Sequence, residues 1–403
     1  SQIAQENNYT ESYLKQFVGR QTWQLLSEAL GKKVNKHNSY LVLNEMLKDS
    51  PISPKEQLTK ITPTTEKINL EFWEGQVPLT SSFYIERPPV ELTCYQEIIQ
   101  PGSWLCIEAP KKMGKTSLLS RILAYGQYQY YQTVRLNLAQ AGTENLTSIK
   151  KLLRWLCANV SLQLGLEPKL DDYWHDDLGN LVSCSIYFQE YLLQQTSHPI
   201  ILALDELELV FEYNTSITRD FLALLHSWHE ETKDISVWSK LRMVVAYSTD
   251  IYLALATNKS PGNLGLAIEL PPFTPTQVED LAQRHELKLS SSEIEQLLHL
   301  TGGFPYLLRL ALAHQVRHNL TVENVWQNAT SDTGIFSAYL HYQLSHLQQH
   351  PDLADAFTEV ITATSTVRLE LEKALKLKGL GLVQLGSNNQ ATVSCDLYRR
   401  YFY

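Results

Sequence analysis

The amino-acid sequence predicts an α/β fold in which a parallel-sheet core carries a helical lid, a C-terminal winged helix and an N-terminal helix-turn-helix segment. Three observations predict the sheet core, the lid and the C-terminal module. Short apolar runs alternate with helical patterns over residues 83–272, whereas helical patterns dominate after Pro271 and Pro272. Two short segments around the turn 386–389 then follow the last helices. Strands that are separated by helices imply a parallel sheet with right-handed crossovers.

Each core strand is expected at an apolar run. The run at 199–204 is almost continuously apolar, as expected of a strand that is buried on both faces. The expected strands cover residues 104–108, 133–138, 199–204, 241–247 and 264–270. Helices are expected at 115–125 and 146–164 in the core, and at 276–285, 291–301 and 305–319 in the lid. The segment 335–403 is expected to hold three helices and the hairpin strands 381–385 and 390–394.

Length and composition indicate a globular protein of several domains. The chain has 403 residues, of which 44% are apolar and 19% charged, and a chain of this size typically forms about two to four domains. We expect a helix-turn-helix-like module at 1–50, a linker at 51–77, the core at 78–273, the lid at 274–332 and the winged helix at 333–403.

The net charge and the cysteine pattern exclude several classes of protein. A formal net charge of -9 argues against nucleic-acid binding over the whole surface, so any DNA contact requires a local basic patch. The five cysteines are scattered, which indicates neither a disulfide framework nor a zinc site. No apolar run approaches the ~20 residues of a membrane span and no signal peptide opens the chain. We therefore expect a cytoplasmic protein without a membrane partner.

A phosphate-binding loop is predicted between the strand at 104–108 and the helix that starts at Lys115. The segment reads Ala109-Pro-Lys-Lys-Met-Gly-Lys-Thr116, with Ala109 where the usual pattern has glycine. Backbone N–H groups of such a loop surround the phosphates, while Lys115 reaches the β- and γ-phosphate oxygens and Thr116 holds Mg²⁺. The residues expected to bind nucleotide here are Pro110, Lys111, Lys112, Met113, Gly114, Lys115, Thr116 and Ser117. The alternative is a chance Gly-Lys-Thr triplet at a helix start.

Two acidic residues after the strand at 199–204 support this prediction. Asp205 follows the strand's apolar run and can join the Mg²⁺ shell, and Glu206 can polarise an attacking water. A surface strand that ends in two acids is the alternative, but it leaves the upstream loop unexplained. Together the two motifs predict a P-loop NTPase that binds ATP or ADP with Mg²⁺ and hydrolyses ATP to ADP and phosphate.

A polar pair follows the strand at 241–247, which in this fold lies between the two motifs. Ser248 or Thr249 is expected to sense the γ-phosphate, and both are candidate catalytic residues. A plain strand cap explains the same residues nearly as well.

Several stretches resemble the AAA-like ATPase family that is common in cyanobacteria. They are residues 78–91, 110–119, 260–265, 269–274 and 301–307. The resemblance runs from about residue 78 to the C-terminus and accommodates Ala109, because alanine is usual there in the family. It implies that Arg87 and Pro88 of a Glu-Arg-Pro box lie against the adenine and ribose. It also implies that the lid segment 302–305 closes over the nucleotide, as in signal-transducing STAND ATPases.

Two lid residues are predicted to bind the nucleotide. Pro305 ends the Gly-Gly-Phe-Pro segment and suits the first turn of a helix. Arg309 follows one turn later and is expected to reach the γ-phosphate as a second sensor, with an exposed helix charge as the alternative.

Residues 1–47 resemble the helix-turn-helix segment that precedes this ATPase in vWA-MoxR-associated conflict proteins. The matching residues include Ile3-Ala4, Tyr9-Thr10, Val18-Gly19 and the stretch 26–31. We expect the chain to begin partway through the motif. Through His37 there are five Lys or Arg residues against three Glu residues, which is a weak excess for phosphate contact. Docking to a protein and binding to DNA therefore both remain open for this module.

Two classes of function compete. The first is a regulatory switch or adaptor ATPase of a bacterial conflict or defence system, which turns over slowly and gates a protein partner or effector. The second is a homo-oligomeric, DNA-binding ATPase comparable to replication initiators or transposition regulators. The acidic net charge and the lid segment favour the first class. The helix-turn-helix and winged-helix modules favour the second.

Overall fold

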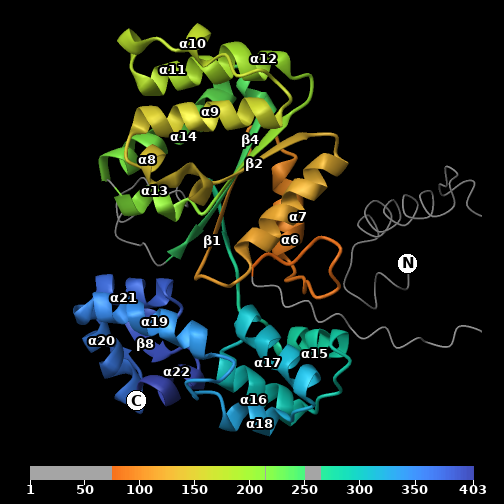
Figure 1. The fold of residues 1–403 in the computed structure, drawn as a ribbon, viewed down its shortest axis with the longest axis vertical. Helices are drawn as coiled ribbons and strands as arrows, with labels where there is room; N and C mark the ends of the chain where they lie inside the picture. The colour runs from red at the N-terminus through yellow and green to blue at the C-terminus, as the bar shows by residue number, and fades with distance from the viewer. Residues whose placement is uncertain (1–74, 214, 250–264) are drawn as a thin grey trace, which may run out of the picture. The chain divides into compact units, whose positions relative to one another are not determined.

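The computed structural model describes residues 75–403, apart from residue 214 and residues 250–264 (Figure 1). The predicted helix-turn-helix module and most of the predicted linker lie outside the described residues. Among the helices of the described ranges, none combines the length and the hydropathy needed to cross a lipid bilayer.

Five parallel strands form the central sheet in the order β2-β3-β4-β1-β5. They are β1 (Trp104–Ala109), β2 (Gln132–Asn137), β3 (Ile200–Asp205), β4 (Leu241–Ser248) and β5 (Leu266–Glu269). The five strands predicted from apolar runs are thus confirmed. Every residue of β3 and β4 is buried, as expected of inner strands of a parallel sheet.

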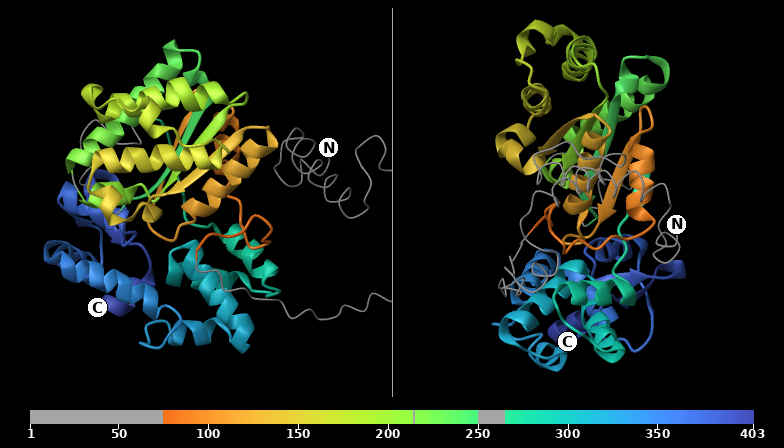
Figure 2. Two further views of the ribbon diagram at one scale, coloured as in Figure 1. Left: turned by 45° about the horizontal axis from the view of Figure 1, so that its top comes forward. Right: turned by 90° about the vertical axis from the view of Figure 1, so that its right-hand side faces the viewer.

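Helices cover both faces of this sheet (Figure 2). One face carries α6 (Val90–Ile98) and α7 (Lys115–Tyr128). The other face carries α8 (Gly142–Leu146), α9 (Ile149–Gln163), α10 (Leu170–Tyr173), α11 (Asn180–Ile186), α12 (Leu193–Gln195), α13 (Glu208–Tyr213) and α14 (Thr215–Asp234). The predictions for α7 and α9 are confirmed, whereas α6 and the helices from α10 to α14 were not predicted.

The side chains of β3 divide between two layers of the core. Ile201 and Ala203 pack into the same hydrophobic cluster as the buried residues of α7. Leu202 and Leu204 pack into a second cluster with residues of α9 and α14. Successive side chains of a strand point to opposite faces, so one continuous apolar run fills both layers. The carboxyl end of β3, which carries Asp205, is therefore held between two packed layers.

The lid contains α15 (Pro275–Arg284), α16 (Ser291–Thr301), α17 (Pro305–His318) and α18 (Val322–Gln327). The predicted lid helices correspond to α15, α16 and α17. Capping boxes start the first two, formed by Thr274 with Gln277 and by Ser290 with Glu293. Pro305 is the first residue of α17, as predicted.

The C-terminal module combines helices with a small antiparallel sheet in the order β6-β8-β7. Its elements are α19 (Ser337–Gln349), α20 (Pro351–Thr362), β6 (Val367–Arg368), α21 (Leu371–Gly379), β7 (Val383–Leu385), β8 (Gln390–Val393) and α22 (Asp396–Phe402). Both predicted hairpin strands are present. The two-residue strand β6 is too short to leave an alternating pattern, and it was not predicted.

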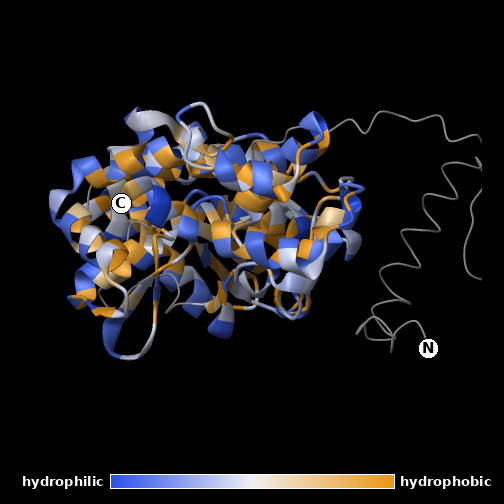
Figure 3. Cartoon of the chain, turned by 90° about the horizontal axis from the view of Figure 1, so that it is seen from below, coloured by the Kyte–Doolittle hydropathy of each residue, from blue (hydrophilic) through white to orange (hydrophobic). Residues whose placement is uncertain are grey.

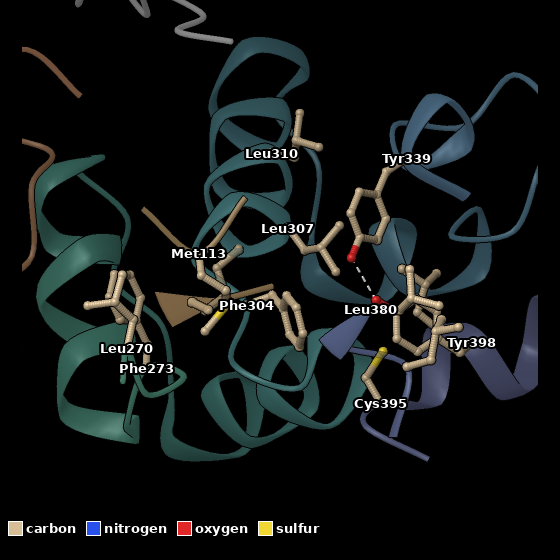
Figure 4. Close-up of a cluster of buried hydrophobic side chains, with 14 of the residues drawn as sticks. Met113, Leu270, Phe273, Phe304, Leu307, Leu310, Tyr339, Leu380, Cys395 and Tyr398 are labelled. Atoms are coloured by element: carbon tan, nitrogen blue, oxygen red, sulfur yellow. Dashed lines mark hydrogen bonds between the residues drawn. The ribbon is translucent and has the colours of Figure 1, made fainter. Parts of the chain in front are cut away.

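The lid and the C-terminal module share one buried cluster with the P-loop side of the core (Figure 4). Phe304 precedes α17 and belongs to this cluster together with Met113 of the loop. A Cβ atom at Gly381 would lie 2.8 Å from the Phe304 ring, so the C-terminal module approaches the lid closely here. Tyr339 and Tyr398 share a hydroxyl hydrogen bond of 2.7 Å at the other end of the cluster. Figure 3 views the molecule from below, where helices show apolar and polar residues in turn, as expected of helices buried on one side.

Candidate functional site

The predicted phosphate-binding loop joins β1 to α7 at the carboxyl edge of the sheet. Lys112 and Gly114 have left-handed backbone conformations, with φ of 68° and 99°, which turn the chain around the start of α7. The Lys115 ammonium donates to the carbonyl oxygens of Ala109 at 2.9 Å and Pro110 at 3.0 Å. The unpaired N–H groups of a helix N-terminus favour an anion at this position. The loop is therefore already folded around the place where phosphates are expected.

Arg87 contacts this loop directly. Its side chain is 2% exposed, and Nη1 donates to the carbonyl oxygen of Met113 at 2.9 Å. A Cβ atom at Gly114 would lie 3.2 Å from Arg87 Nη2, which favours glycine at this position. The Nε atom of Arg87 is buried and has no hydrogen-bond partner among the described residues, so it can donate to a ligand oxygen. Pro88 and Pro110, which were also predicted to bind nucleotide, are not among the residues that line the cavity beside the loop.

Asp205 and Glu206 lie beside Thr116, as the P-loop prediction requires. Thr116 Oγ1 donates to Asp205 Oδ1 at 3.3 Å, and Arg135 Nη2 donates to Asp205 Oδ2 at 2.9 Å. Glu206 has a φ of 58°, an uncommon conformation for a residue with a side chain. Its carboxylate accepts a hydrogen bond of 3.4 Å from Asn137 Nδ2. Strand β2 thus supplies one partner to each of the two acidic residues.

The loop, the two acids and the lid line one cavity of about 520 Å³, which is within the usual range for small-molecule sites. Its basic residues are Arg87, Lys111, Lys112, Lys115 and Arg309, and its acidic residues are Asp205, Glu206 and Glu208. Apolar walls come from Phe83, Ile85, Phe273 and Leu281, and the lining also includes the predicted residues Met113, Gly114, Thr116 and Ser117. The excess of basic side chains fits a polyanion, and the apolar walls fit a flat ring.

Both predicted lid residues lie in this cavity. Pro305 and Arg309 line it from α17, together with Tyr306. The Arg309 guanidinium lies 4.9 Å from the centre of the Phe83 ring, and burial lowers the pKa of Arg309. A partly buried guanidinium gains from a nearby anion, so this placement fits the predicted contact with a phosphate.

Ser248 and Thr249 are placed differently from the other predicted residues, and neither lines the nucleotide cavity. Ser248 is buried, and its N–H donates to Glu208 Oε2 at 3.0 Å. Thr249 Oγ1 donates to the carbonyl oxygen of Gly379 at 3.0 Å. Thr249 also lines a second cavity of about 570 Å³ between the core and the C-terminal module. The geometry therefore links Thr249 to the C-terminal module rather than to the nucleotide cavity.

A buried histidine follows helix α15 of the lid next to the cavity, and its titration predicts that the fold is sensitive to acid. His285 is 1% exposed, its Nδ1 lies 2.8 Å from the Leu281 carbonyl oxygen, and its ring centre lies 4.4 Å from that of Phe83. Burial is the main cause that lowers the pKa of His285 from 6.5 to about 4. The unfolded chain therefore binds a proton at a higher pH than the folded protein. Stability is complete above the unfolded pKa and is lost as the pH falls toward the folded pKa.

We expect His285 to account for about 2 kcal/mol of lost unfolding free energy between pH 7 and pH 5. Urea denaturation at the two pH values measures this loss. In His285→Gln the loss should shrink by that amount, because no proton can be taken up on unfolding. An equal loss in the variant and the wild type would contradict the assignment.

The loop, the strand order and the acids of β3 together define a P-loop ATPase fold. The chain belongs to the AAA-like domain family, whose sequence profile matches residues 72–403. Residues 1–46 match the N-terminal helix-turn-helix of vWA-MoxR associated proteins. Both matches confirm the resemblances identified in the sequence. No significantly similar sequence is found among curated proteins.

One solved structure shows a similar fold at low sequence identity, and two others match with lower TM-scores. The Walker-type ATPase PABY2304 of Pyrococcus abyssi is 15% identical with a TM-score of 0.56, over 79% of this chain and 96% of that chain. The ORC2 protein of Aeropyrum pernix is 12% identical with a TM-score of 0.46, over 80% of this chain and 96% of that chain. A STAND protein with a tetratricopeptide repeat sensor, PH0952 of Pyrococcus horikoshii, is 13% identical with a TM-score of 0.37, over 81% of this chain and 44% of that chain.

Several residues of the site were missed by the sequence analysis. Arg135 and Asn137 of β2 contact the two acids, and Gln76 lines the cavity just before the core. A signal for the first two was present. They alternate with the apolar residues Val134 and Leu136 in a strand that was predicted to lie in the same sheet as β3. Polar residues at every second position share one face of a strand.

Proposed function

We propose that the protein is an ATP-binding regulatory switch or adaptor that hydrolyses ATP slowly in a bacterial conflict or defence system. One observation carries this proposal, namely that the loop which lines the nucleotide cavity also contacts the two modules that follow the core. The Lys112 ammonium lies 4.7 Å from the ring centre of Tyr306 in the lid. The Lys111 ammonium lies 5.3 Å from the ring centre of Tyr342 in the C-terminal module. A change at the phosphates would therefore reach both modules.

The residues of the chain suit slow hydrolysis. Lys115 and the loop amides would hold the β- and γ-phosphates, with Arg309 approaching from the lid. Thr116 and Asp205 offer the oxygen donors that Mg²⁺ prefers, and the metal would neutralise charge on the phosphate oxygens. Glu206 would polarise the attacking water. One oxygen of its carboxylate accepts a hydrogen bond from Asn137, and a donor to the carboxylate lowers its basicity, which favours a low turnover.

The match of residues 1–46 supports the conflict-system role, because proteins with that helix-turn-helix are described as vWA-MoxR associated. Under this proposal the N-terminal module docks to a protein partner or effector of the same system. A homo-oligomer is compatible with the proposal, since many P-loop ATPases act as rings or pairs.

A second candidate function is DNA binding through the C-terminal module, which we interpret as a winged helix with α21 in the position of the recognition helix. Figure 1 places α21 on the side of the module that faces the core. Lys378 of α21 pairs with Glu269 of β5 at 3.2 Å, and the Gly379 carbonyl accepts from Thr249. Lys376 pairs with Glu372 of the same helix at 2.8 Å. These contacts favour the switch, since α21 would have to leave the core before it could enter a groove of DNA.

The two functions are separated by measuring DNA binding and ATP hydrolysis on the full chain. Fluorescence anisotropy with duplex DNA would be recorded over a range of salt concentrations, with ADP, with ATP and without nucleotide. The switch predicts slow phosphate release that DNA does not accelerate, and weak DNA binding that is independent of nucleotide. ATP-dependent DNA binding that falls steeply with salt would instead favour the initiator-like function.

Weakening the contact between the core and the C-terminal module is expected to accelerate ADP release. The double variant Thr249→Val/Glu269→Lys removes a hydrogen bond and places a like charge next to Lys378. We expect about tenfold faster dissociation of a fluorescent ADP analogue in stopped flow. Glu295→Lys is the matched control, because it makes the same charge change at an exposed position of α16 that lines neither cavity. Equal release rates in all three proteins would argue against coupling through this contact.

A further inference from the structure

Arg135 forms an ion pair with the carboxylate that the proposed function assigns to the metal. Arg135 Nη2 and Asp205 Oδ2 are 2.9 Å apart, and their side chains are 31% and 2% exposed. Thr116 Oγ1 and the N–H of Glu206 both donate to the other oxygen, Oδ1, at 3.3 Å and 3.2 Å. One carboxylate oxygen therefore faces the loop, while the other is already bound to a cation of the chain itself.

The Arg135 guanidinium is held firmly in this position. Nη1 donates to Gln76 Oε1 at 2.8 Å and to Ser120 Oγ at 3.1 Å. The side-chain amide of Gln163 bonds both the N–H and the carbonyl oxygen of Arg135, each at 2.9 Å. Gln163 thereby satisfies backbone groups on the outer side of β2, which is an edge strand of the described sheet. Because both its backbone and its side chain are anchored, the arginine is pre-organised toward Asp205.

A buried carboxylate without a counter-charge is strongly unfavourable, so Asp205 needs a cation whenever no metal is bound. Arg135 supplies that cation. We propose that Arg135 is a positioning residue that acts as the built-in counter-ion of Asp205 and thereby weakens Mg²⁺ binding at the nucleotide site. The inference rests on the proposed function, because it takes Thr116 and Asp205 as the metal-binding pair.

The direction of the effect follows from thermodynamic linkage. Loss of Arg135 destabilises the metal-free protein, in which Asp205 is left without a counter-charge. The metal-bound protein is destabilised less, because the divalent cation supplies the missing positive charge. The difference between the two states appears as tighter binding of Mg²⁺. Arg135 thus sets how strongly the nucleotide site depends on magnesium.

The counter-ion is also connected to the segment that precedes the core. Gln76 accepts from Arg135, and the next residue, Val77, donates its N–H to Ser117 Oγ of α7 at 2.8 Å. Both residues fall at the end of the predicted linker at 51–77. Removing the Gln76 contact leaves Arg135 less firmly held, so Gln76→Ala is expected to change magnesium dependence in the same direction as loss of Arg135 and by a smaller factor.

The test is the affinity of the full chain for ADP, measured by titration calorimetry with excess Mg²⁺ and again with EDTA. The ratio of the two affinities is the magnesium-dependent gain. In Arg135→Gln we expect this gain to be about tenfold larger than in the wild type. Arg135→Lys keeps the charge but loses the forked contacts of the guanidinium, so its gain should lie between those of the wild type and Arg135→Gln. Arg154→Gln is the control, since it removes an arginine of α9 that is paired with the exposed Asp171 and lines neither cavity.

A gain in Arg135→Gln that equals or falls below that of the wild type would overturn the counter-ion role. Failure of the wild type to bind ADP at all would instead contradict the proposed function. A double-mutant cycle in the nucleotide-free protein tests the ion pair independently. Arg135→Gln/Asp205→Asn removes both charges, so it should fold and be more stable than the two single changes predict together. Simple additivity, or a double variant that folds no better than Arg135→Gln, would also overturn the proposal.

Discussion

Lys115→Ala is expected to abolish binding of ATP and ADP, with a loss of affinity of about 100-fold or more. The Lys115 ammonium bridges the carbonyl oxygens of Ala109 and Pro110 at the start of the loop. Lys115 therefore stabilises the loop conformation and also supplies a positive charge where phosphates are expected. Alanine removes both, and no other lysine in the loop is placed on the first turn of α7.

A fluorescent ADP analogue measures this loss directly, and a thermal melt confirms that the variant is folded. Lys150→Ala is the control, because Lys150 lies on α9, is 45% exposed and pairs with the surface residue Asp176. The control should bind nucleotide like the wild type. Unchanged affinity in Lys115→Ala would refute the assignment of the loop.

Glu206→Gln is expected to leave nucleotide binding intact while slowing hydrolysis by about 100- to 10,000-fold. Glutamine has the same shape and can keep the contact with Asn137, so the uncommon backbone conformation at this position need not change. It cannot accept the proton of an attacking water. The variant should therefore accumulate bound ATP, which chromatographic analysis of the protein-bound nucleotide after a single turnover would measure.

Glu208→Gln provides the matched control for this prediction. Glu208 lines the same cavity, but its carboxylate accepts the N–H of Ser248 and a glutamine oxygen can do the same. We expect hydrolysis to change by no more than about threefold in the control. If Glu206→Gln hydrolyses ATP at the wild-type rate, or Glu208→Gln is the slower variant, Glu206 is not the residue that activates water.

The parallel sheet could be predicted because its strands are buried on both faces. The apolar run that became β3 contains no polar interruption and leads directly into Asp205. The run that became β4 is apolar apart from Arg242 and leads into Ser248. The strand order could not be predicted, since no local pattern says which strands become neighbours. The helices between 170 and 195 were missed for a different reason. They are broken into short pieces with a π-helical turn at Tyr187–Leu192, so their apolar residues keep no single helical period.

The loop and the acids of the site could be predicted because phosphate and magnesium chemistry restricts the residues allowed there. Thr116 and Asp205 are 89 positions apart in the sequence, yet the two motifs were enough to predict that both belong to one metal site. The partners of the acids could not be predicted in the same way. Arg135 and Asn137 act through the register of β2 against β3, which pairs Asn137 with Asp205. Register is a property of the assembled sheet, and it leaves no motif in the sequence.

The structure places Thr249 differently from the position that the analogy between folds suggested. Its position after β4 suggested a γ-phosphate sensor, whereas its hydroxyl donates to Gly379 of the C-terminal module. The direction of a side chain after a strand depends on the loop that follows, and on what packs against it. The resemblance implied that Arg87 lies against the adenine and ribose, and this stays a prediction. In the structure Arg87 lines the cavity and its guanidinium donates to the carbonyl oxygen of Met113.

The central claim is that a lysine, a ring of main-chain amides and two acidic side chains form a nucleotide site at the carboxyl edge of the sheet. Titration calorimetry of the wild-type protein with ADP and with a non-hydrolysable ATP analogue, in magnesium buffer, tests this most directly. We predict saturable binding of one nucleotide per chain, which Lys115→Ala eliminates. The absence of any heat of binding for either nucleotide, in protein shown to be folded, would contradict it.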